Sequence, residues 1–139
     1  MSGMHLVHFV VLVAWGLVVV VEAALELGAR TDPQRRRVAR LHYWIDLLVE
    51  IPLLLAVLAT GTILLFGAWP PSPLLGLKIG LALIAIGING YCAIHVILRH
   101  RRSDDVRALA HHGRRVLLSG LGAPAALAAA YLGVTYFLR

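Results

Sequence analysis

The sequence predicts an all-α membrane protein, a bundle of four transmembrane helices that run up, down, up and down. Its composition is one reason, because 60% of its 139 residues are hydrophobic and only 14% are charged, whereas soluble domains are about half apolar and about a quarter charged. The apolar residues also fall into four segments: Leu6–Leu27, Leu41–Phe66, Leu74–Leu98 and Val116–Leu138. Each exceeds the roughly 20 residues that a helix needs to cross a bilayer. We therefore expect one integral membrane domain over residues 1–139, surrounded by lipid.

The arginines predict how these helices are oriented in the membrane. Every arginine except Arg139 lies between the first and second segments or between the third and fourth, and the 67–73 connection has none. Because basic connections stay on the cytoplasmic side, we expect an N-out and C-out, multi-pass protein of a bacterial-type inner (cell) membrane. The net charge of +6 is then a topology signal, and we do not expect nucleic acid as a partner.

Each segment has features that fit a membrane helix. The first carries acidic residues and has neither a basic start nor a small-residue cleavage site, so we expect a retained helix and not a signal peptide. Prolines at 33 and at 70–73 separate the second segment from its neighbours. Gly76 and Gly80 in the third segment, and several small residues in the fourth, allow helices to approach closely. This pattern fits packing within one chain and equally a homo-oligomer. The single cysteine, Cys92, excludes an internal disulfide.

Ionisable side chains inside the apolar segments are the strongest indication of function. Glu22 and Glu26 lie near the end of the first segment, and His42, Asp46 and Glu50 follow one another at four-residue steps in the second. Such groups are costly in a bilayer and usually face the bundle interior, where they mark a site. At 100° per residue each set falls on one side of its helix. We expect these sides to meet inside the bundle.

Further polar residues divide into an inner and an outer group. Lys78, Asn89 and Cys92 share one face of the third segment, and His95 is turned further round it. By their distance from the basic loops, His8 and Lys78 lie near the outer interface, whereas Asn89 and His95 lie toward the cytoplasmic side. The sequence therefore predicts a carboxylate and imidazole cluster on the inner side, and an imidazole and amine pair on the outer side.

The residues alone leave three interpretations of the inner cluster open. Its members can reach the membrane surface or pair with loop arginines, or they can pass protons through the membrane. They can also hold a metal ion, because helix-bundle di-metal proteins use glutamates and histidines from facing helices. Carboxylates with one or two imidazoles suit Fe, Mn or Zn. The candidate metal ligands are Glu22, His42, Asp46, Glu50 and His95.

Several motifs are also placed as in a known membrane protein family. They occur in this order along the chain: His8 and Trp15, Pro52 and Gly61, Leu77-Lys78-Ile79, and Pro124 after Arg114-Arg115. In their order and offsets they resemble the motifs of the HemJ-type protoporphyrinogen oxidases, which are four-helix membrane proteins related to copper-resistance D-type bundles. The resemblance touches all four segments. Three departures stand out: Asn89 stands where the family tends to have a histidine, Leu121-Gly122 replaces the family's Asn-Glu before the proline, and the acidic residues 22, 46 and 50 have no counterpart in the family pattern.

The resemblance implies a haem b within the bundle and the oxidation of protoporphyrinogen IX, a porphyrin-like substrate. It nominates His8 and Lys78 as the residues required for activity. It also places Trp15 and Asn89 beside the cofactor, with Asn89 standing where the family tends to have a histidine. A neutral imidazole can ligate haem iron, and a lysine can meet a propionate.

Three hypotheses of function therefore come from the sequence. The first is a haem-associated oxidoreductase that uses His8 and Lys78. The second is a metal-binding or metal-translocating protein that uses the inner cluster. The third is a structural or accessory membrane subunit without chemistry of its own.

Overall fold

The structure, a computed structural model, describes residues 3–137 and is helical wherever it forms regular structure. Its elements are α1 (Gly3–Gly28), α2 (Asp32–Ile45), the π-helical turn η1 (Asp46–Glu50), α3 (Ile51–Gly67), α4 (Pro73–Arg101), α5 (Val106–Ser119), the 3₁₀ turn η2 (Gly120–Gly122) and α6 (Ala123–Phe137). Four continuous helical stretches are long and apolar enough to span a membrane: Gly3–Gly28, Asp32–Gly67, Pro73–Arg101 and Val106–Thr135. The chain is therefore a transmembrane helical bundle, as its composition predicts.

The helices extend beyond the apolar segments because polar caps start them earlier. The second begins at Asp32 and not at Leu41, since Thr31 and Gln34 form a capping box ahead of an arginine-rich turn. The fourth begins at Val106 and not at Val116, because the Asp105 side chain caps it by accepting from the backbone N–H groups of Arg107 and Ala108. These added turns are helical but basic, so hydropathy alone does not detect them.

The second span contains a widened turn at the depth of its acidic residues. In η1 the Ile51 N–H donates to the Asp46 carbonyl, five residues back. Pro52 follows directly and has no N–H to continue the regular ladder. Such π turns inside helices are frequent at functional sites. Here the turn carries Asp46 and Glu50, both of which are buried.

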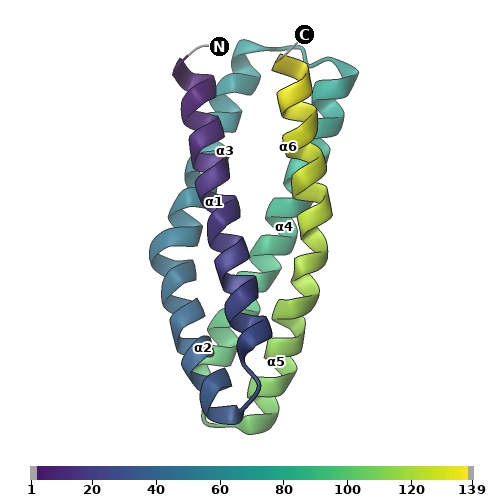
Figure 1. Ribbon diagram of the computed structural model, residues 1–139. Helices are drawn as coiled ribbons and strands as arrows, with labels where there is room; N and C mark the ends of the chain where they lie inside the picture. The colour runs from purple at the N-terminus through teal and green to yellow at the C-terminus, as the bar shows by residue number, and fades with distance from the viewer. Residues whose placement is uncertain (1–2, 138–139) are drawn as a thin grey trace.

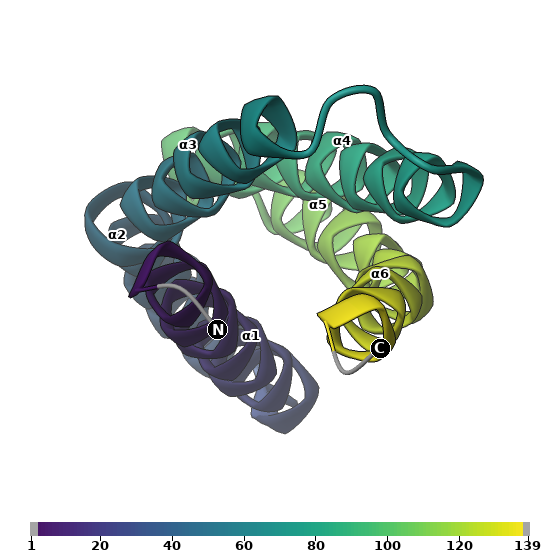
Figure 2. The same ribbon diagram turned by 90° about the horizontal axis from the view of Figure 1, so that it is seen from above.

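The helices follow one another around an open curve, whose two ends are α1 and α6 (Figure 2). The start of α1 and the end of α6 lie at the same end of the molecule, and the α1–α2 and α4–α5 connections lie at the opposite end (Figure 1). At the end with the two connections, α2, α4 and α5 pack on one another. Toward the end with the termini, α1 packs on α3 and α4 packs on α6. The bundle is therefore packed at its basic end and divides into two helix pairs toward the other end.

Apolar side chains cover the outside of the bundle, and polar ones occupy much of its centre. Leu17, Val20 and Leu55 are each at least 60% exposed, which fits contact with lipid and would be costly in water. The buried polar residues are Glu22, His42, Asp46, Glu50, Arg99 and His112. This inversion of the soluble pattern fits a protein whose solvent is the bilayer.

Candidate metal centre

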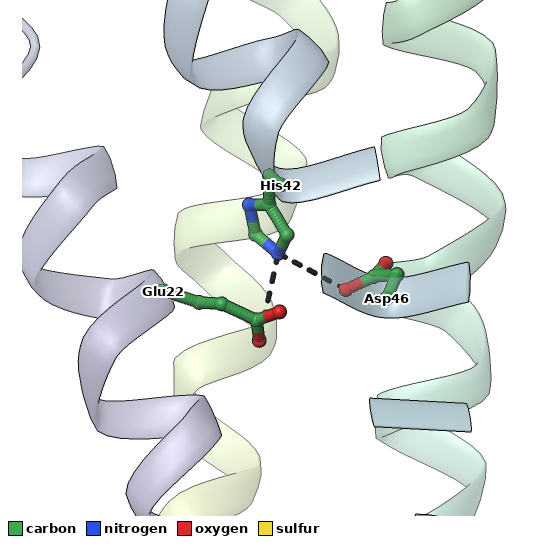
Figure 3. A group of neighbouring side chains, drawn as sticks. All are labelled: Glu22, His42 and Asp46. Carbon is green, nitrogen blue, oxygen red and sulfur yellow. Dashed lines mark ion pairs between the residues drawn. The ribbon is translucent and has the colours of Figure 1, made fainter. Parts of the chain in front are cut away.

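Three side chains from two helical spans meet inside the bundle, in the half that carries the α1–α2 and α4–α5 connections. Glu22 comes from α1, His42 from α2 and Asp46 from the π turn, and their side chains converge (Figure 3). The His42 Nε2 atom lies 3.7 Å from an oxygen of Glu22 and 3.4 Å from an oxygen of Asp46. One potential ligand atom from each residue falls within 4.8 Å of the others. Three of the five predicted metal ligands are therefore neighbours.

Each residue of this cluster has at least one buried polar atom without a hydrogen-bond partner among the described residues. Glu22 is 5% exposed, and His42 and Asp46 are each 2% exposed. Within the described part of the chain, four of their atoms form no hydrogen bond: His42 Nε2, Glu22 Oε1 and both carboxyl oxygens of Asp46. Buried polar groups are nearly always partnered. An arrangement of lone pairs directed at a common point is what a bound cation requires.

A chain of charged groups fixes the orientation of His42. The Arg99 guanidinium donates to both oxygens of Glu26, through Nη1 at 2.8 Å and through Nη2. A carboxylate held in this way only accepts, so His42 Nδ1, 2.6 Å from Glu26 Oε1, is the donor of their hydrogen bond. In a neutral His42 the lone pair therefore lies on Nε2, the atom that faces Glu22 and Asp46. This is how carboxylate partners orient metal-binding histidines.

Glu50 adjoins the cluster but is held by other partners. One of its oxygens accepts from the Trp15 indole N–H at 3.1 Å and from the Asn89 amide at 2.5 Å. Its carboxyl group also adjoins that of Asp46. The two residues that the resemblance places beside a cofactor, Trp15 and Asn89, thus meet at Glu50.

A cavity of about 260 Å³ opens beside the centre. Glu22, Glu26, His42 and Glu50 line its polar part. The rest of its wall comes from α1, α4, α5, η2 and α6 and is mostly apolar, with Cys92 and Ser119 among its few polar groups. We call it the inner cavity.

The outer pair of polar residues lines a second cavity of about 260 Å³, which we call the outer cavity. His8 and Lys78 both face it, with Trp15 at its boundary with the inner cavity. The His8 Nδ1 atom lies 2.7 Å from the Thr60 hydroxyl, which itself donates to the Ala56 carbonyl. The Thr60 oxygen is therefore the acceptor from His8 Nδ1, and His8 Nε2 keeps its lone pair.

The structure does not bring His95 into the cluster. Its Nδ1 lies 2.9 Å from His112 Nδ1, so these two histidines join α4 to α5 at the basic end. Arg99 was predicted only as a topology signal, but its side chain is buried, at 3% exposed, and forms an ion pair with Glu26. The sequence did contain a signal, because the inward face of α4 continues to Arg99 at four- and three-residue steps through Ala85, Asn89, Cys92 and Val96.

Comparison with known protein families, curated proteins and solved structures finds no match to this chain. The function is therefore argued from the site itself.

Proposed function

We propose that this protein is a membrane-embedded metal-binding protein, with Glu22, His42 and Asp46 as the ligands of one divalent ion. The observation that carries the proposal is the convergence of three buried ligand side chains, in which His42 Nε2 and both Asp46 oxygens have no hydrogen-bond partner in the part of the chain that the structure describes. Two ligand atoms that are each about 2.1 Å from a tetrahedral ion lie about 3.4 Å apart. The separations of 3.4 and 3.7 Å from His42 Nε2 match that spacing.

The charges around the site also support a cation. Four carboxylates, those of Glu22, Glu26, Asp46 and Glu50, lie close together in the inner half. Among the lysine and arginine side chains of the described residues, only that of Arg99 is buried, and it already forms an ion pair with Glu26. Uncompensated charge inside a membrane is expensive. A divalent ion would offset much of the remaining negative charge, and an oxygen-rich set with one imidazole suits Fe, Mn or Zn.

The test is the metal content of the purified protein. After equilibration with Zn²⁺, Mn²⁺ or Fe²⁺ and removal of free metal, we expect about one ion per chain by elemental analysis. Asp46→Asn and His42→Gln should each lose it. The matched controls are Asp104→Asn and His111→Gln, which alter exposed residues at the basic end and should keep it. Metal bound equally by all five proteins, or by none, would refute the proposal.

A second function is favoured by the outer cavity. A haem-associated oxidoreductase resembling protoporphyrinogen IX oxidase would use His8 and Lys78, which share this cavity. The free lone pair on His8 Nε2 is a suitable iron ligand, and Lys78, which takes part in no ion pair of the described residues, could meet an acidic substituent. A Soret band that disappears in His8→Ala, but not in His5→Ala, would support haem. A colourless protein from haem-replete cells would exclude it.

The orientation in the membrane belongs to the same proposal. We infer an up-down-up-down arrangement with both termini outside the cytoplasm of a bacterial-type cell. The arginine-bearing connections lie at one end of the bundle, away from the start of α1 and the end of α6 (Figure 1), and basic connections stay inside. In a Cys92→Ala background, an impermeant maleimide should label Trp69→Cys in intact cells and leave Ser103→Cys unlabelled. The reverse pattern would invert the topology.

A further inference from the structure

The inner cavity has a polar floor and an apolar entrance. Glu22, Glu26 and His42 form its floor beside the candidate metal centre. Toward the outside of the bundle its walls carry Val20 and Leu127, which are 65% and 70% exposed. These residues belong to α1 and α6, the two helices at the ends of the open curve of the bundle (Figure 2). The cavity therefore opens sideways, between α1 and α5–α6.

At the basic end, packed side chains cover the centre against a molecule larger than an ion. There the buried Arg99 side chain lies across the site, bound to Glu26. Gly113 of α5 closes over it, since a Cβ at this position would lie 3.4 Å from Arg99 Nη1. On the other side, η2 sits tightly on α4, because a Cβ on Gly122 would meet Ile88 at 2.8 Å. The side opening is left as the entrance, and it faces the acyl chains.

We propose that a lipid-soluble small molecule enters the inner cavity from the bilayer and presents a compact polar group to the candidate metal centre. This inference rests on the proposed function in one respect: the metal centre is the partner that the polar group of the molecule would contact. An apolar wall excludes hydrated ions but accepts a hydrocarbon body. A cavity of 150 Å³ is enough for benzene, so about 260 Å³ admits a somewhat larger body. The polar group is an oxygen or nitrogen donor that can approach a metal ion.

The single cysteine makes this entrance testable. Cys92 lines the inner cavity. In liposomes, neutral and lipid-soluble N-cyclohexylmaleimide should alkylate Cys92, whereas the charged reagent trimethylammonium-ethyl methanethiosulfonate should react at least tenfold more slowly. Each rate is divided by the rate for the same protein unfolded in detergent. Val19→Cys in a Cys92→Ala background provides a second reporter, since Val19 lines the inner cavity and does not line the outer one.

Filling the cavity tests the route more sharply. Gly16 lines the inner cavity, and a Cβ there meets nothing within 4 Å. Gly16→Leu should therefore slow maleimide labelling at least tenfold without unfolding the protein. Gly87→Leu is the matched control, because Gly87 is also unhindered but lines neither cavity. It should label at the normal rate.

The outcomes separate this inference from the metal centre. Three results would each overturn the lateral entrance. The charged reagent could label both cysteines as fast as the neutral one does, or the neutral reagent could label neither. The third is an equal labelling rate in Gly16→Leu and Gly87→Leu. Metal binding would then still stand. If the labelling follows expectation but the protein binds no metal, the entrance stands and the metal centre fails.

Discussion

Replacing Asp46 by asparagine is expected to change the stability of this protein in opposite directions with and without metal. The Asp46 carboxyl group is 2% exposed, has no hydrogen-bond donor in the described residues and adjoins the carboxyl groups of Glu22 and Glu50. In the metal-free protein it is therefore a source of repulsion. With metal bound, the same carboxylate becomes a ligand.

The size of the effect follows from the geometry. The candidate ligand atoms lie within 4.8 Å of one another, and two unit charges at that distance repel by about 3.5 kcal/mol at an effective dielectric constant near 20. Proton uptake by the cluster relieves part of this repulsion, so we expect the net effect to be smaller than the full figure. An asparagine amide also donates to oxygens that otherwise have no partner. We expect Asp46→Asn to stabilise the metal-free protein by about 1–3 kcal/mol.

Metal should reverse the order of stability. An ion at about 1,000 times its Kd adds about 4.1 kcal/mol to the stability of a protein with one intact site, which exceeds the whole advantage expected for metal-free Asp46→Asn. The unsubstituted protein should gain this amount, and Asp46→Asn should gain none.

The assay is thermal or denaturant unfolding in detergent, followed by tryptophan fluorescence, with a chelator and with added metal. Asp104→Asn, which removes an exposed acid, should behave as the unsubstituted protein in both conditions. The reasoning is refuted if Asp46→Asn destabilises the chelated protein by more than about 1 kcal/mol, or if its stability still rises with metal.

Two further substitutions test the packing around the centre. Arg99→Met should cost about 3–5 kcal/mol of unfolding free energy because it leaves Glu26 buried and unpaired, and adding Glu26→Gln should recover more than half of that loss in the same assay. Gly122→Ala should cost about 1–3 kcal/mol, because its Cβ would lie 2.8 Å from Ile88; Gly120→Ala, with nothing within 4 Å, should change stability by less than about 1 kcal/mol. Equal effects of the two glycine substitutions would show that the close contact with Ile88 has no energetic consequence.

The sequence alone was sufficient to predict the four membrane-spanning helices and the inward faces of the first two. A bilayer demands about 20 apolar residues per crossing, so composition and segment length identify the spans without any tertiary information. It also penalises stray charge, so the faces that carry Glu22, His42, Asp46 and Glu50 had to turn inward, and all four are buried.

Tertiary structure decided which of these side chains form one site. Helical periodicity places a residue on a face, but not at a distance from residues of another helix. His95 has a side chain that can ligate a metal, but it lies against His112 and outside the cluster. Arg99, which was predicted only as a topology signal, is buried and forms an ion pair with Glu26. The π turn before Pro52 sets where Asp46 and Glu50 point, and one additional residue in a turn leaves little trace in hydropathy. Three-dimensional packing therefore gathers Glu22, His42 and Asp46 around one point, because only the crossing of two helices determines how closely their inward faces approach.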